Sequence, residues 1–107
     1  GAAACVVAAI ERLGGHPLAY VLDFSEVSFL DSSAATANEG FVRKAHRQNA
    51  AVYVAAPQST LRRTLLTHGV RPPRVKFRRT LEDAIASANS FAREKGGNVV
   101  PFPSART

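Results

Sequence analysis

The hydrophobic residues of this chain fall into short runs, and the spacing inside the runs alternates between two kinds. Segments 18–24 and 51–56 are nearly continuous apolar stretches that contain β-branched and aromatic residues, and 75–77 is a shorter stretch of the same kind. Turn-forming residues separate each stretch from the next segment of the chain. Runs of this length and composition predict strands at 18–24, 51–56 and 75–77.

Between the predicted strands, apolar residues recur three and four positions apart, which is typical of helices with one buried face. Ser59 and Thr80 suit the N-cap positions of two of these helices, and Asp83 follows Thr80 at the spacing of a capping box. Asn49 suits the left-handed conformation that often follows a helix. The helices are predicted over residues 3–13, 32–48, 60–68 and 81–95.

Strands that alternate with helices indicate right-handed crossovers and a largely parallel sheet. We therefore predict a small α/β fold with about four helices. The 107 residues, 46% of them hydrophobic and 21% charged, suit one domain. We expect this domain to span residues 1–97. Residues 98–107 contain two prolines and no periodicity, so we expect a tail or linker there.

The chain contains no Met, and we expect it to be a piece of a longer protein. It has no apolar run of the ~20 residues that a bilayer span needs and no signal peptide. Its single cysteine, Cys5, cannot form an internal disulfide. We expect this piece to be soluble and to reside in a reducing, cytoplasmic setting.

Positive charge is concentrated in the middle of the chain. The net charge is +6, and ten of the fourteen Lys and Arg residues lie between Gly40 and Thr80, a segment without Asp or Glu. The local aromatic residues occupy predicted core positions, which disfavours nucleic acid as a partner. A solvated face is the simplest interpretation, and anionic lipid headgroups or acidic loops of a membrane domain are the alternative. The expected basic surface comprises Arg43, Lys44, Arg47, Arg62, Arg63, Arg78 and Arg79.

The most informative stretch runs from the first predicted strand into the second predicted helix. The strand breaks at Asp23, and Asp31-Ser32-Ser33 stands directly before the change to helical spacing. Asp and Ser are favoured at a helix start because their oxygens accept hydrogen bonds from unpaired backbone N–H groups. The expected inner face of the helix holds Ala34, Ala37, Phe41 and Ala45.

The sequence from Val21 to Ala34 resembles the central signature of the STAS domain, in which an apolar strand ends in Asp and is followed by an apolar residue and Asp-Ser-Ser/Thr-Gly. Asp23 and Asp31-Ser32-Ser33 match this pattern, whereas Ala34 stands where most members have Gly. The resemblance extends from Gly1 to about Lys95. It implies one or two strands before the first helix, and we expect them to be absent here. The exposed sheet edge would then favour a homodimer.

The resemblance implies two alternative functions, neither of them enzymatic. The first is the cytoplasmic regulatory domain of a bacterial SulP-type sulfate or related anion transporter, located at the inner membrane with the transmembrane domain as its partner. The second is a freestanding anti-sigma factor antagonist. There Ser33, or less favourably Ser32, would be the phosphorylated residue. Ala34 in place of Gly argues against this switch because the loop loses backbone freedom.

The resemblance also allows weak binding of a guanine nucleotide by Asp31, Ser32, Ser33, Gln58 and Ser59. A simple capping role for the serines stays open beside both functions. We expect no catalytic residues, because no spacing of Ser, His and Asp supports a triad and no phosphate-binding Gly-Lys loop is present. We also expect no metal site and no cofactor, since the three His and one Cys are scattered.

Overall fold

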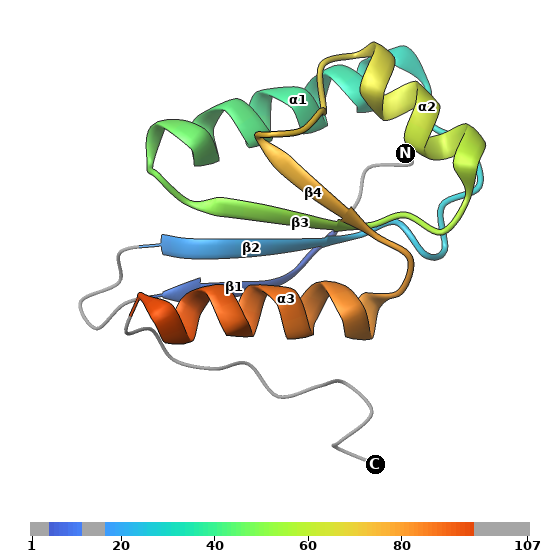
Figure 1. Ribbon diagram of the computed structural model, residues 1–107. Helices are drawn as coiled ribbons and strands as arrows, with labels where there is room; N and C mark the ends of the chain where they lie inside the picture. The colour runs from blue at the N-terminus through green and yellow to red at the C-terminus, as the bar shows by residue number, and fades with distance from the viewer. Residues whose placement is uncertain (1–4, 12–16, 96–107) are drawn as a thin grey trace.

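A computed structural model describes residues 5–11 and 17–95, which form a four-stranded sheet between two layers of helices (Figure 1). The strands lie in the order β1-β2-β3-β4. β1 pairs with β2 antiparallel, and β2, β3 and β4 are parallel. The predicted small α/β fold with a largely parallel sheet is therefore confirmed. The elements are β1 (Cys5–Glu11), β2 (Pro17–Asp23), α1 (Ser32–Arg47), β3 (Ala51–Ala55), α2 (Ser59–Thr67), β4 (Val75–Arg78) and α3 (Leu81–Glu94).

Residues 5–11 form a strand, so the helix predicted over residues 3–13 is wrong. β1 runs along β2, with Cys5 opposite Asp23 and Ile10 opposite Ala19. A short apolar run fits both periodicities, and the unpaired backbone groups of β2 favour the strand. The described part of the chain thus has three helices rather than about four. The edge of β2 that we expected to be exposed is paired with β1.

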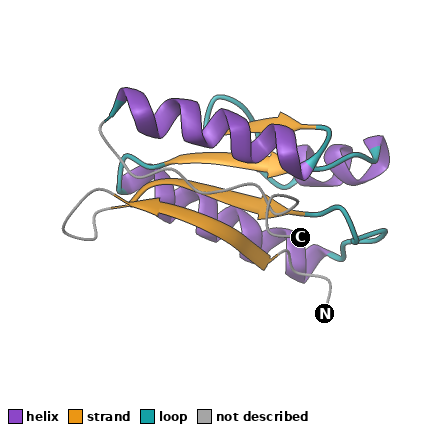
Figure 2. Ribbon diagram, turned by 90° about the horizontal axis from the view of Figure 1, so that it is seen from below, coloured by secondary structure: helices purple, strands orange, loops and turns teal. Residues whose placement is uncertain are grey.

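Each face of the sheet supports its own core. Leu22, Val52 and Val54 belong to the core under α1 and α2. Val21 and Tyr53, which alternate with them along the strands, belong to the core under α3. The sheet therefore lies between α3 on one face and α1 and α2 on the other (Figure 1 and Figure 2). Burial on both faces explains why β2 and β3 read as continuous apolar runs.

The buried face of α1 agrees with the prediction at Ala45 but is shifted by one position at the three residues nearer the start of the helix. Its buried residues are Ala35, Asn38, Val42 and Ala45, whereas Ala37 is exposed. Asn38 is tolerated inside because its side-chain amide donates to the carbonyl of Ala34 over 2.8 Å. Because Asn38 is polar, the spacing of apolar residues alone does not reveal the buried face of α1.

The helix ends agree with the sequence at two of three positions. Asn49 adopts φ 60°, as expected after α1. Thr80 caps α3, because its hydroxyl accepts a hydrogen bond from the Asp83 N–H over 3.0 Å. Ser59, in contrast, is the first residue of α2, and the N-cap is Gln58 without a side-chain hydrogen bond. Among the described residues, no helix has the length and apolar character needed to cross a bilayer.

Candidate functional site

The loop between β2 and α1 begins with a firmly held segment. The Phe24 N–H donates to the carbonyl of Ala55 over 2.8 Å, which extends the pairing of β2 with β3 by one residue. The Asp23 carboxylate accepts from the Ser25 N–H over 2.8 Å. Phe24 is only 1% exposed. Asp23 of the signature thus has a local structural role, because its carboxylate stabilises the chain reversal after β2.

The loop ends at the start of α1 on a second set of contacts. The Asp31 carboxylate accepts from the Ala34 N–H over 2.8 Å, so this residue is the N-cap that the sequence predicts. Ser32 and Ser33 are the exposed first residues of the helix. Both hydroxyls are therefore accessible beside unpaired backbone N–H groups, the environment that favours an added phosphate.

Ala34 does not deprive the loop of freedom, because it lies inside α1 and not in the loop. Its side chain packs against the core under α1 and α2. A helical backbone needs no glycine, and Ala is the residue most favourable to a helix. The departure from the family pattern at this position is thus compatible with the observed local structure.

One large apolar side chain of the loop lies outside the core. Phe29 is 71% exposed, while the next residue, Leu30, is 5% exposed. Phe29 lines a shallow pocket of about 130 Å³ together with Ser28 and Leu30, and α2 supplies the opposite wall through Thr60 and Thr64. Phe29 was not among the residues predicted from the sequence, although its place between the polar Ser28 and the helix cap is visible there.

The predicted loop residues lie at the end of the sheet where β2 and β3 have their C-terminal residues. Asp23 of β2 lies opposite Ala55 of β3, and the chain leaves both strands at this end. Gln58 and Ser59 are exposed at the start of α2. The segment before Asp31 lies against α2 across the shallow pocket. We call Phe29, Ser32, Ser33, Gln58 and Ser59 the loop–α2 surface.

A guanine nucleotide at this end of the sheet stays a prediction. The pocket beside Phe29 has about 130 Å³, whereas pockets that enclose small molecules usually have about 300–1,000 Å³. The pocket volume therefore gives nucleotide binding no support in this conformation.

The predicted basic residues do not form one continuous face. Arg43, Lys44, Arg47, Arg63 and Arg79 are exposed. The half-buried Arg62 and Arg78 have structural contacts. Arg62 donates to the Ala56 carbonyl over 2.6 Å. Arg78 donates to the Ser87 hydroxyl on α3, on the opposite side of the sheet from α1 and α2.

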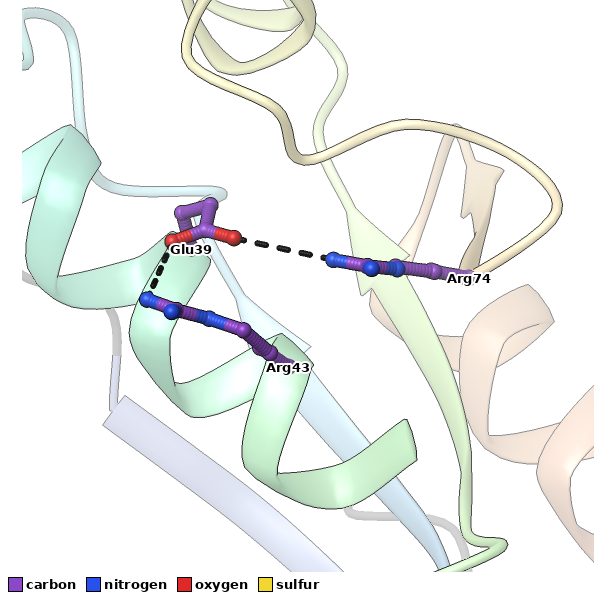
Figure 3. Close-up of polar contacts among 3 residues, drawn as sticks. All are labelled: Glu39, Arg43 and Arg74. Carbon is purple, nitrogen blue, oxygen red and sulfur yellow. Dashed lines mark hydrogen bonds and ion pairs between the residues drawn. The ribbon is translucent and has the colours of Figure 1, made fainter. Parts of the chain in front are cut away.

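Glu39 links α1 to the segment before β4 (Figure 3). Its carboxylate lies 2.9 Å from Arg43 and 3.6 Å from Arg74. Pairs this exposed contribute roughly 0–1 kcal/mol each. Their main effect here is to hold Arg43 and Arg74 near Glu39, whose negative charge offsets part of the positive charge of this region.

Within residues 5–11 and 17–95, no three His, Cys, Asp or Glu side chains gather in a way that could hold a metal ion. His46 is exposed on α1, and the ring of His68 lies 2.9 Å from the Thr64 carbonyl. The absence of catalytic activity stays a prediction.

Replacing Asp31 by Ala is expected to lower the free energy of unfolding by about 1 kcal/mol, because the Ala34 N–H loses its acceptor. Asp31→Asn keeps a side-chain oxygen and is expected to lose only a few tenths of a kcal/mol. Urea unfolding of both variants measures the difference. An equal loss in the two variants would show that the carboxylate charge, and not the capping hydrogen bond, stabilises this helix start.

The geometry is that of a domain with a capped, hydroxyl-bearing helix start and an exposed Phe at one end of a mostly parallel sheet. Comparisons with curated proteins and with solved structures gave no match. A scan against protein-family models matched the STAS domain over residues 3–84, which is most of the chain and includes Asp23 and the Asp31-Ser32-Ser33 cap. The chain therefore belongs to the STAS domain family.

Proposed function

We propose that this STAS domain is the cytoplasmic regulatory domain of a bacterial SulP-type sulfate or related anion transporter. In this role the domain binds the transmembrane domain of the same transporter through the loop–α2 surface. The observation that carries the proposal is Phe29, a large apolar side chain that is 71% exposed beside the hydroxyl-bearing start of α1.

The loop holds the backbone of Phe29 in place while the side chain remains exposed. Phe24 on one side and Leu30 on the other are both buried, so the loop is anchored at two points around the exposed ring. Moving a Phe side chain out of water is worth about 1.5–3 kcal/mol. Part of this free energy becomes available when a partner covers Phe29, and anchored aromatic residues often dominate interfaces.

The exposed cations of α1 support a position near the membrane. Arg43, Lys44 and Arg47 project into solvent from the C-terminal half of the helix. Each such charge near an anionic surface contributes about 1 kcal/mol of attraction. The partial pairing of Arg43 with Glu39 reduces its share.

A freestanding anti-sigma factor antagonist is the second candidate. Ser33 supports it, because its hydroxyl is exposed in the first turn of α1. A phosphate there would meet backbone N–H groups and also the charge of the neighbouring Asp31, so partner affinity would change. Guanine nucleotide binding and a homodimer remain further predictions for either candidate.

Cell fractionation separates the two candidates. An antibody raised against this chain is used to detect the natural protein in membrane and cytosolic fractions of its source. The transporter role predicts a membrane protein that resists carbonate extraction and is several times larger than the 11.4 kDa of this chain. A cytosolic protein only slightly larger than the chain would overturn the proposal and favour the antagonist.

A further inference from the structure

A second, larger pocket lies on the face of the sheet opposite α1 and α2. It has a volume of about 350 Å³ and is formed by β3, β4 and one side of α3. The pocket is more open to solvent than the one beside Phe29, and its volume is comparable with the ~300–1,000 Å³ of small-molecule sites. Neither the STAS signature nor the loop–α2 surface contributes a residue to it.

The pocket lining includes an arginine that two hydrogen bonds hold in place. Arg78 donates from Nε to the Ser87 hydroxyl over 2.8 Å and from one terminal nitrogen to the Phe77 carbonyl over 2.9 Å. A guanidinium has five N–H donors, so others remain for a ligand. Ser87 accepts from Arg78, and its own O–H is left to donate. The two side chains thus form a pre-arranged set of donors.

Tyr53 supplies a further hydrogen-bond donor beside Arg78. It lines the pocket and is only 4% exposed, with the Arg78 guanidinium 5.8 Å from the centre of its ring. Within the described part of the chain its hydroxyl makes no hydrogen bond and is reached by solvent, so it is accessible to a ligand in the pocket. Burial raises the pKa of Tyr53, while Arg78 lowers it and Glu94 raises it. The phenol is therefore protonated at neutral pH and able to donate.

The pocket lining also includes a positive and a negative side chain. Lys76 lies two residues before Arg78 on β4, and Glu94 lies seven residues after Ser87 on α3. The structure shows no ion pair between Lys76 and Glu94 within the residues that it describes. Phe91, half-buried, adds an apolar wall.

We propose that this pocket binds a small phosphate or sulfate monoester. The oxyanion accepts from the Arg78 guanidinium and from the hydroxyls of Ser87 and Tyr53, and Lys76 adds positive charge. The organic part lies along Phe91, with its hydroxyl or amino groups toward Glu94. Arg suits this role because its planar fork matches two oxygens of such an anion. The site lies apart from the loop–α2 surface and does not depend on the proposed function.

Titration of the chain in a chloride buffer of constant ionic strength tests the proposal. The probes are glycerol 3-phosphate, inorganic phosphate, inorganic sulfate and vesicles that contain phosphatidic acid, with binding followed by calorimetry and amide chemical shifts. We expect saturable binding of glycerol 3-phosphate, tighter than that of either inorganic ion, with shifts centred on β4 and α3. Binding to the vesicles with no response to the soluble ester would identify a lipid headgroup as the source of the monoester.

Variants identify the donors. Tyr53→Phe removes only the hydroxyl and is expected to weaken binding about tenfold, the loss typical of a hydrogen bond to a charged group. Arg78→Lys keeps the charge but loses the fork, and a similar or larger weakening is expected. Arg63→Ala, an exposed cation on α2, is the matched control and should leave the affinity unchanged. Unfolding curves check that each variant is folded.

Two outcomes overturn the proposal. One is the absence of saturable binding by any of the four probes. The other is binding that Arg63→Ala weakens as much as Tyr53→Phe and Arg78→Lys do, which would indicate general attraction of anions to a basic protein.

Discussion

Replacing Phe24 by Ala is expected to lower the free energy of unfolding by about 3–5 kcal/mol, the usual loss for a buried Phe. The residue is 1% exposed, and it belongs to the core shared by α1, α2 and the sheet. Domains of this size have a total stability of about 5–15 kcal/mol. The loss would therefore be a large share of the total, and it is measured by urea or thermal unfolding.

Phe29→Ala is the matched control, since it makes the same substitution five residues further along the same loop. Phe29 is 71% exposed, so its loss should change the free energy of unfolding by no more than about 0.5 kcal/mol. Losses of similar size in the two variants would contradict the assignment of Phe24 as the anchor and Phe29 as the exposed residue.

Replacing Phe29 by Asp in the full-length natural protein is expected to have the largest functional effect. A central aromatic residue of an interface commonly contributes about 2 kcal/mol or more, and a carboxylate at that place would also have to be desolvated. We expect affinity between this domain and its partner to fall at least about tenfold. Under the proposed transporter role, anion uptake should fall with it, at unchanged amounts of protein in the membrane.

Two controls keep this second prediction specific. Phe29→Leu keeps an apolar contact and should retain most of the affinity and uptake. Glu26→Gln alters an exposed residue of the same loop outside the loop–α2 surface and should have no effect. Normal uptake by Phe29→Asp, with the protein correctly inserted, would contradict a docking role for this surface.

The alternation of strands and helices after Pro17 was predictable, because the periodicity and the turn residues agree with each other there. The strands over 18–24 and 51–56 differ from β2 and β3 by at most one residue at either end. Asp31, Asn49 and Thr80 were placed correctly for a similar reason. Each has a local backbone role that depends on neighbours in sequence rather than on tertiary packing.

The errors came where distant parts of the chain decide the outcome. The segment 3–13 suits either a helix or a strand until the free edge of β2 is available for pairing. Packing of α1 on the sheet buries Asn38, and a local hydrogen bond to a carbonyl one turn earlier makes this burial tolerable. The sequence also places Arg78 beside Arg79 in one basic run, although the pleat of β4 directs Arg78 toward α3.

The sheet thus separates two surfaces with different chemistry. The loop–α2 surface offers an exposed aromatic ring and hydroxyls without a sizeable pocket. The pocket beside α3 offers an arginine that the Ser87 hydroxyl and the Phe77 carbonyl hold in place.

Hydrogen–deuterium exchange, measured on this chain alone and within the full-length natural protein, shows whether a partner covers the loop–α2 surface. We predict slower exchange in the full-length protein at residues 28–33 and 58–64, because docking protects these backbone amides from solvent. Exchange at α3 should be unchanged in the absence of added ligand. Equal exchange at 28–33 in both samples, or protection confined to β4 and α3, would contradict docking through Phe29.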